Sequence, residues 1–120
     1  MSSKKILIVD DEEGIRESLK LILGDFYDLI LVENGAQCLD TLGRTDDIGL
    51  VLIDIKMPKI NGLEILPKIK AKRPDLKVIV VTGYKSVETA AEAVRLGASD
   101  YIVKPFKSEA ILGAVKQYLS

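Results

Sequence analysis

At the centre of this chain lies the stretch Leu50-Val51-Leu52-Ile53-Asp54-Ile55-Lys56-Met57-Pro58. Four consecutive aliphatic residues are typical of a strand that is buried on both faces, and this run ends at a carboxylate. We expect regular structure to end near Asp54, because a proline follows shortly after it. Withdrawing a carboxylate from water costs free energy unless charges or hydrogen bonds compensate. Asp54 therefore requires partners from elsewhere in the chain.

Composition limits the possible classes of protein. The 120 residues are enough for a single domain, 1–120, that buries roughly two-thirds of its unfolded surface. Hydrophobic residues make up 48% of the chain, and two Phe, four Tyr and no Trp mean that the core is aliphatic. The net charge of −1 gives no general reason to expect nucleic-acid binding. A lone Cys38 and the absence of His exclude a disulfide framework, a Cys/His zinc site and His-based acid–base catalysis. Cys38 itself is predicted to be a small buried hydrophobe.

The N-terminal segment is not expected to be a signal peptide. Met1-Ser2-Ser3-Lys4-Lys5 precedes only a short apolar run that ends in acids, and this is not the pattern of a signal peptide. Apolar stretches also stay far below the length of a membrane span. We expect a cytoplasmic protein with no membrane partner.

Two kinds of apolar pattern alternate along the chain. Short, continuous apolar runs predict five strands, at 6–9, 27–32, 48–53, 77–81 and 101–103. Helical spacing predicts five helices, at 14–24, about 36–42, from 62 after the N-cap Asn61, from 87 after the N-cap Ser86, and from about 108 to 119. Pro67 is expected to kink or weaken the third helix. In the fourth helix, the predicted inward face consists of Val87, Ala90, Ala91 and Val94, and Gly97 ends the helix.

This alternation predicts an α/β fold in which a parallel sheet carries helices on both faces. Ligands of such sheets bind at the carboxyl ends of the strands. The residues expected at those ends are Asp10, Asp11, Asp54, Thr82 and Lys104. Asp54 is thus predicted to lie among two further acids, a hydroxyl and an ammonium.

This set of side chains has a definite chemistry. Three converging carboxylates repel one another unless one is protonated or a cation lies between them. Hard oxygen ligands without His or Cys favour Mg²⁺, which also takes phosphate oxygens. Asp54 is then a candidate nucleophile that forms an aspartyl phosphate, with Lys104 and Thr82 on the phosphoryl oxygens. Without a His to act as base, water attack on the product is expected to be slow.

Several motifs in register now resemble one family. Asp10-Asp11 follows the first strand, Asp54 ends the third, and Met57-Pro58 precedes Gly62. Thr82-Gly83 and the tract Tyr101-Ile102-Val103-Lys104-Pro105-Phe106 complete the set. Together, over about residues 4–119, they resemble the receiver domain of two-component response regulators. The tract formed by 82–84 and 97–106 is most similar to receivers of nitrogen-regulatory-type transcription activators. The resemblance implies the flavodoxin-like strand order 2-1-3-4-5.

The resemblance also implies roles at the site. Asp54 would accept a phosphoryl group from the phosphohistidine of a sensor kinase, from a phosphotransfer protein or from a small acyl phosphate. Asp11, Asp54 and the backbone carbonyl of Lys56 would hold Mg²⁺, with Asp10 helping directly or through water. Lys104 would contact the phosphoryl group.

Further roles concern the switch and its surface. Thr82 would move toward the phosphoryl group while Tyr101 turns inward, and the Lys104–Pro105 bond would be cis. Lys56 and Tyr84 occupy variable positions where side chains can shield the phosphoryl group from water. The surface of the fourth helix, fifth strand and fifth helix would contact an output domain or a second copy. Such a domain would catalyse only its own phosphoryl transfer and slow dephosphorylation, and would not be an enzyme in the usual sense.

Other interpretations remain open for single residues and for the whole chain. Asp10 and Asp11 can be helix-capping charges, and Lys104 can be an exposed lysine with an apolar stem. A flavin or nucleotide module has the same architecture but requires a phosphate-binding loop where this chain has four acids, 10–13. An aspartate-dependent phosphohydrolase usually has a second acid at the position of Lys56. A stand-alone or degenerate receiver that acts only as an interaction module is the last alternative.

Overall fold

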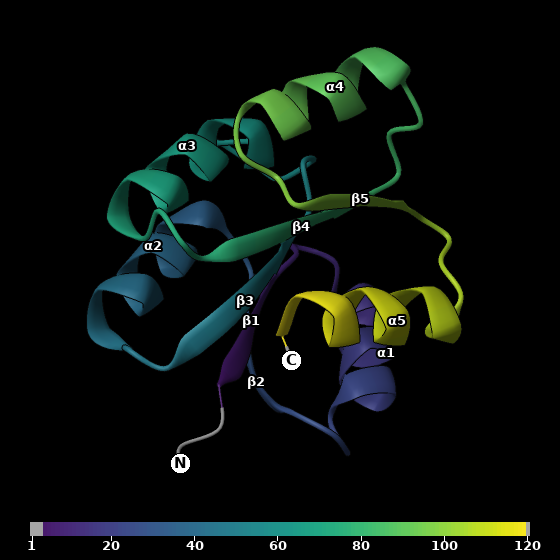
Figure 1. Ribbon diagram of the computed structural model, residues 1–120. Helices are drawn as coiled ribbons and strands as arrows, with labels where there is room; N and C mark the ends of the chain where they lie inside the picture. Colours follow the sequence, from purple (N-terminus) through teal and green to yellow (C-terminus); the bar gives the residue numbers. More distant parts are fainter. Residues whose placement is uncertain (1–3, 120) are drawn as a thin grey trace.

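The computed structural model describes residues 4–119, which form one parallel sheet covered by helices (Figure 1). The strands are β1 (Lys5–Val9), β2 (Asp28–Val32), β3 (Ile48–Ile53), β4 (Lys77–Thr82) and β5 (Asp100–Val103). The helices are α1 (Glu13–Leu23), α2 (Gly35–Arg44), α3 (Gly62–Lys72), α4 (Val87–Arg95) and α5 (Ser108–Leu119). The strand order β2-β1-β3-β4-β5 confirms the predicted doubly wound α/β fold. The expectation for Met1–Ser3 lies outside the described residues.

The register of the sheet aligns the carboxyl ends of its strands. In the parallel pairs Val9 lies opposite Ile53, and Ile53 lies opposite Val80. Thr82, at the end of β4, lies opposite Val103, at the end of β5. The residues that follow β1, β3 and β5 therefore emerge at the same edge as Thr82.

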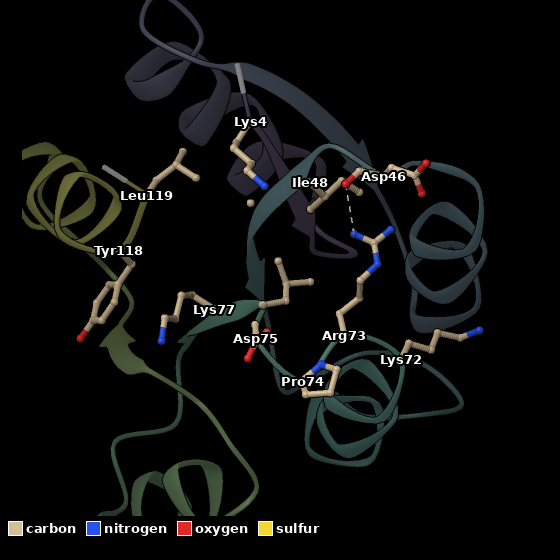
Figure 2. Close-up of a pocket in the computed structure, with 12 residues that line it drawn as sticks. Lys4, Asp46, Ile48, Lys72, Arg73, Pro74, Asp75, Lys77, Tyr118 and Leu119 are labelled. Atoms are coloured by element: carbon tan, nitrogen blue, oxygen red, sulfur yellow. Dashed lines mark hydrogen bonds between the residues drawn. The ribbon is translucent and has the colours of Figure 1, made fainter. Parts of the chain in front are cut away.

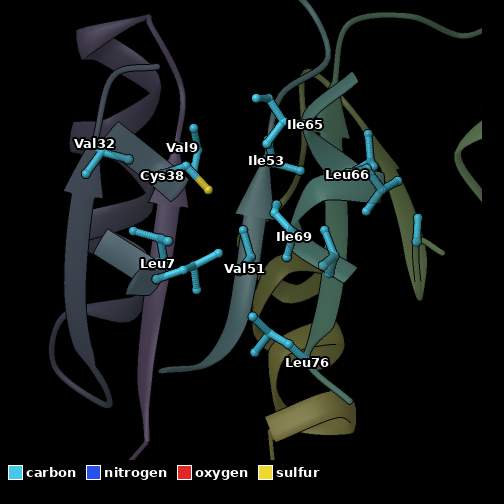
Figure 3. Packing of buried hydrophobic residues seen from close by; sticks show 14 of the residues in the cluster. Leu7, Val9, Val32, Cys38, Val51, Ile53, Ile65, Leu66, Ile69 and Leu76 are labelled. Carbon is cyan, nitrogen blue, oxygen red and sulfur yellow. The ribbon is translucent and has the colours of Figure 1, made fainter. Parts of the chain in front are cut away.

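Both faces of the central strands are buried, as their continuous apolar runs predict. Alternate residues of β1, β3 and β4 pack on one face against α2, α3 and α4 (Figure 3). The residues between them pack on the other face against α1 and α5. Cys38 of α2 is fully buried in the first cluster, which confirms its prediction, and burial raises the pKa of its thiol to about 12. The core is aliphatic and lies on both sides of β3.

Helix α4 corrects one prediction. Val87, Ala91 and Val94 are exposed, with 84% of Val87 and 59% of Val94 accessible to water, so the predicted inward face is wrong. The fully buried residue of this helix is Ala93, and Ala90 is half-buried. Helix α4 packs against α3 and β5, and the side chains that it turns toward the core are alanines. The larger apolar residues of α4 consequently face solvent.

The helix ends follow the predicted caps. Asn61 Oδ1 accepts from the Glu64 N–H, and Ser86 Oγ accepts from two backbone N–H groups of the first turn of α4. Gly97 follows α4 with φ of 114°, a left-handed conformation that favours glycine. Helix α3 runs unbroken through the exposed Pro67, so a kink there stays a prediction. Among the helices of residues 4–119, none has the length and apolar character needed to span a bilayer.

Candidate functional site

The predicted strand-end residues meet at the carboxyl edge of the sheet. Asp10 follows β1, Asp54 follows β3 and Lys104 follows β5, while Thr82 is the last residue of β4. Asp10, Asp54 and Thr82 are buried, each with 3% or less of its surface exposed. Their position follows from the register, since parallel strands end side by side.

Lys104 is the partner that Asp54 requires. Its Nζ donates to Asp54 Oδ2 at 3.1 Å and to Asp10 Oδ2 at 2.8 Å. A third contact joins Nζ to Glu12 Oε1 at 3.3 Å. One ammonium thus contacts two buried carboxylates and one exposed carboxylate, which lie in the segments that follow β1 and β3.

Backbone N–H groups orient the buried carboxylates. The Lys56 N–H donates to Asp54 Oδ1 at 3.2 Å, and the Glu12 N–H donates to Asp10 Oδ1 at 2.9 Å. Each carboxylate is therefore held by a backbone donor on one oxygen and by Lys104 on the other. Throughout residues 4–119, every buried side-chain nitrogen or oxygen has a hydrogen-bond partner. The hydrogen bonds of the buried carboxylates are therefore satisfied by the protein itself.

Burial and charge shift the ionisation of this group. Burial raises the pKa of Asp10 above its usual value, although the hydrogen bond from Lys104 and the N–H of Glu12 oppose the shift. Burial alone would lower the pKa of Lys104, but its hydrogen bonds and charge interactions with Asp10 and Asp54 outweigh this and raise it. Lys104 therefore carries its positive charge throughout the neutral range.

The acids at this edge are suited to a cation. Carboxylate oxygens of Asp10, Asp11, Glu12 and Asp54 lie within 4.8 Å of one another. Such an oxygen-only donor set fits a hard divalent cation such as Mg²⁺. Asp11 and Glu12 are exposed on the solvent side of the cluster, so an ion has access. The candidate site residues drawn from the sequence omitted Glu12, and the signal that could have indicated it was its place in the acidic run 10–13.

Thr82 and Tyr101 are linked through one loop. The Tyr84 N–H approaches Thr82 Oγ1 at 3.5 Å, and the Tyr101 hydroxyl donates to the Tyr84 carbonyl at 2.8 Å. The Lys104 N–H donates to the Thr82 carbonyl at 2.8 Å, and the Lys104–Pro105 bond is cis, as the resemblance implies. Burial, followed by the charge of Asp54, raises the pKa of the Tyr101 phenol, which therefore remains a donor at neutral pH. Thr82 of β4 and Tyr101 of β5 are thus joined through the backbone of Tyr84.

The mouth of the site is a small pocket above Asp54. Its lining comes from the four loops at the carboxyl edge and includes Glu12, Lys56, Thr82, Tyr84 and Lys104. Lys56 and Tyr84, predicted to shield a phosphoryl group, both lie at this pocket and are both exposed. The pocket is open enough for a small anionic group to reach Asp54.

A larger pocket lies at the opposite end of the sheet and contains none of these residues (Figure 2). One of its lining side chains is Arg73, whose guanidinium donates to the backbone carbonyls of Leu42, at 2.7 Å, and Thr45. Arg73 thereby joins the end of α3 to the turn between α2 and β3. This arrangement stabilises the fold and presents no convergent chemistry.

A glycine permits the close packing behind Asp54. The Gly62 N–H donates to the Ile55 carbonyl at 2.8 Å, and a Cβ at position 62 would lie 2.2 Å from the Asp54 carbonyl oxygen. Only glycine fits so close to another backbone. The start of α3 therefore fixes the backbone that carries Asp54.

The family of this chain follows from comparison with known proteins. The model of the response regulator receiver domain matches residues 6–116. The chain belongs to this family. Its function is that of a receiver domain in phosphorylation-activated signalling.

Individual relatives agree with this assignment. The receiver is 40% identical to sporulation initiation phosphotransferase F of Bacillus subtilis, over 99% of this chain and 96% of that protein. It is 37% identical to the response regulator protein FleR of Pseudomonas aeruginosa, over 95% of this chain but 24% of that protein. A crystal structure of a CheY-like receiver domain protein from Methanospirillum hungatei superposes with a TM-score of 0.92 at 37% identity, covering 98% of this chain and 94% of that one. The receiver thus spans nearly all of one relative and about a quarter of another.

Proposed function

We propose that Asp54 is the residue of this receiver that accepts the phosphoryl group. The observation that carries the proposal is the position of its carboxylate, buried at the end of β3 with one oxygen 3.1 Å from Lys104 and the other held by the Lys56 N–H. A carboxylate oxygen attacks the phosphorus of a phosphohistidine or of a small acyl phosphate. The bond from phosphorus to the donor nitrogen or oxygen breaks, and the electron pair leaves with the donor.

The surrounding residues neutralise the charge of the incoming group. Lys104 is positioned to contact a phosphoryl oxygen, and the Thr82 hydroxyl is positioned to donate to another. Asp10, Asp11, Asp54 and the Lys56 carbonyl are the residues that would hold Mg²⁺, which when bound supplies charge neutralisation for the phosphoryl oxygens. Histidine is absent from the sequence, so the product has no imidazole base to promote its hydrolysis. The receiver catalyses its own phosphorylation and slow dephosphorylation, and no other turnover is proposed.

Phosphorylation then acts as a population shift. Added charge and acceptor oxygens favour one arrangement of Thr82, and the loop at Tyr84 transmits this preference to Tyr101. The surface formed by α4, β5 and α5 is the proposed contact for an output domain or a second copy. Sensor histidine kinases and phosphotransfer proteins are the proposed donors. A single receiver domain at 1–120, a cytoplasmic location and the absence of direct nucleic-acid binding stay predictions.

The first test is the intact mass of the protein after incubation with acetyl phosphate and Mg²⁺. We expect an increase of one phosphoryl group in the wild type and in Asp47→Asn, and none in Asp54→Ala. Asp47 is a matched control because it is an acid that precedes β3, at the opposite end from the site. Adduct formation in Asp54→Ala, or its absence from the wild type with several donors, would contradict the proposal.

Two further arms complete the test. Chelation of divalent ions should abolish adduct formation, and Mg²⁺ should restore it. Sustained hydrolysis of an aryl phosphate in large excess over protein would instead support a phosphohydrolase. Lys56, at the position where such an enzyme usually has its second acid, argues against that outcome.

A further inference from the structure

We propose that Glu12 is a positioning residue that competes with the phosphoryl group for Lys104 and thereby slows phosphorylation of Asp54. This inference rests on the proposed function of Asp54. It concerns a contact that the strand-end pattern does not predict, because Glu12 lies beyond the end of β1, between Asp11 and the first residue of α1.

The ammonium of Lys104 is saturated in this structure. A lysine ammonium has three N–H donors. Among residues 4–119, its acceptors are Asp10 at 2.8 Å, Asp54 at 3.1 Å and Glu12 at 3.3 Å. A phosphoryl oxygen can therefore gain a hydrogen bond from Lys104 only when one of these three acceptors withdraws.

Glu12 is the acceptor that withdraws most easily. The side chains of Asp10 and Asp54 are 3% exposed, and each is also held by a backbone N–H. The Glu12 side chain is 62% exposed, and its contact with Lys104 is the longest of the three. Glu12 and Lys104 both line the pocket above Asp54, where a phosphoryl donor must arrive.

The helix that follows gives a second observation. Glu12 is the N-cap residue of α1, with φ of −91° and ψ of 116°. An acidic side chain near this end of a helix is stabilised by the exposed N–H groups and the dipole. Within the described chain, the Glu12 carboxylate makes no capping hydrogen bond and lies instead on Lys104. Its orientation is thus explained by the ammonium and not by the helix.

The negative charge of Glu12 acts in addition to its competition for the N–H groups of Lys104. A carboxylate at the mouth of the pocket repels an anionic phosphoryl donor, and this repulsion weakens as salt screens it. Glutamine at position 12 would keep the length and a neutral acceptor but would lose the charge. We therefore expect Glu12→Gln to weaken the contact with Lys104 and to favour the approach of the anion.

The test compares Glu12→Gln with Glu13→Gln. Glu13 is the next acid in the chain, is exposed in the first turn of α1, and lies outside the set of acceptors of Lys104, so it controls for net charge. At saturating Mg²⁺, acetyl phosphate should phosphorylate Glu12→Gln faster than Glu13→Gln by about threefold or more, the scale of one lost surface charge contact. Beryllofluoride, a phosphoryl mimic that requires no turnover, should bind Glu12→Gln correspondingly more tightly in a fluorescence or NMR titration.

The outcomes separate this inference from the proposed function. Equal rates and equal beryllofluoride affinities in the two variants would overturn the role of Glu12 while leaving Asp54 as acceptor. Slower phosphorylation of Glu12→Gln than of Glu13→Gln at saturating Mg²⁺ would also overturn it, because Glu12 would then assist the transfer. Failure of the wild type itself to form an adduct would overturn the function of Asp54.

Discussion

The phenolic hydroxyl of Tyr101 donates a 2.8 Å hydrogen bond to the backbone carbonyl of Tyr84, so strand β5 is tied to the loop that follows β4. Thr82 lies two residues before Tyr84, and its hydroxyl oxygen is 3.5 Å from the Tyr84 backbone nitrogen. A displacement of Thr82 toward a phosphoryl group would therefore move the Tyr84 carbonyl, which accepts the hydrogen bond from the Tyr101 hydroxyl. The contact between the two tyrosines joins the loop at the site to β5, which belongs to the proposed contact surface of α4, β5 and α5.

Replacement of Tyr101 by Phe removes this hydrogen bond and keeps the ring. We expect changed backbone NMR shifts at 83–86 and a fall in the free energy of unfolding of about 1 kcal/mol or less. Tyr118→Phe is the matched control, since its hydroxyl also donates to a backbone carbonyl, that of Ser99 at 2.9 Å. Shifts at 83–86 that are the same in the wild type and Tyr101→Phe would show that the contact does not hold the loop.

Tyr84 is predicted to shield the phosphorylated Asp54 from water. Its side chain is 45% exposed at the mouth of the pocket, where it can limit the approach of a water molecule. Tyr84→Ala should lose its phosphoryl group faster than the wild type by about threefold or more, a barrier change of somewhat under 1 kcal/mol. Decay is followed by intact mass after removal of the donor. Tyr84→Phe should resemble the wild type, and decay in the wild type as fast as in Tyr84→Ala would refute the shielding role.

Gly62 is predicted to be intolerant of a side chain. A Cβ at this position would lie 2.2 Å from the Asp54 carbonyl oxygen and 2.9 Å from Ile55 Cα, and both of these are backbone atoms. Gly62→Ala should lower the free energy of unfolding by about 2–3 kcal/mol, as overpacking does. Urea denaturation measures the change, and the displaced Asp54 should also be phosphorylated more slowly.

Gly113 supplies the control for this substitution. It lies in α5, where an added Cβ meets no atom within 4 Å. Gly113→Ala should raise the free energy of unfolding by up to about 1 kcal/mol because alanine favours the helix. A Gly62→Ala variant as stable as Gly113→Ala would mean that the backbone at Asp54 and Ile55 shifts to accommodate the added Cβ at little cost in free energy.

The exposed face of α4 leads to a prediction about association. Val87→Ser and Val94→Ser should each change the free energy of unfolding by about 0.5 kcal/mol or less, because both side chains are largely in water. Each should weaken self-association of the beryllofluoride-loaded protein in sedimentation experiments, if the surface of α4, β5 and α5 is a contact between copies. Leu21→Ser is the control, since Leu21 is 81% exposed on α1, on the other side of the sheet. A loss of more than about 2 kcal/mol in Val94→Ser would show that Val94 is a core residue after all.

The sequence by itself determined the fold class and the strand ends. Continuous apolar runs such as 50–53 are buried on both faces of a sheet, and parallel strands must end at one edge. Asp10, Asp54, Thr82 and Lys104 were therefore predicted to meet, and the structure brings them together. The strand order came from the resemblance, because periodicity carries no information about which strands are neighbours.

The tertiary structure alone decided which side chains touch. Helical spacing cannot tell which side of a short helix faces its neighbours, so the face of α4 was predicted wrongly while its caps were predicted correctly. Likewise, the acidic run 10–13 placed Glu12 near the site but did not distinguish it from Glu13. Its carboxylate reaches Lys104 across 92 positions of the chain only because β1 and β5 end at the same edge of the sheet. Contacts of this kind depend on distances between helices and strands, and these distances cannot be predicted from local patterns of apolar and polar residues.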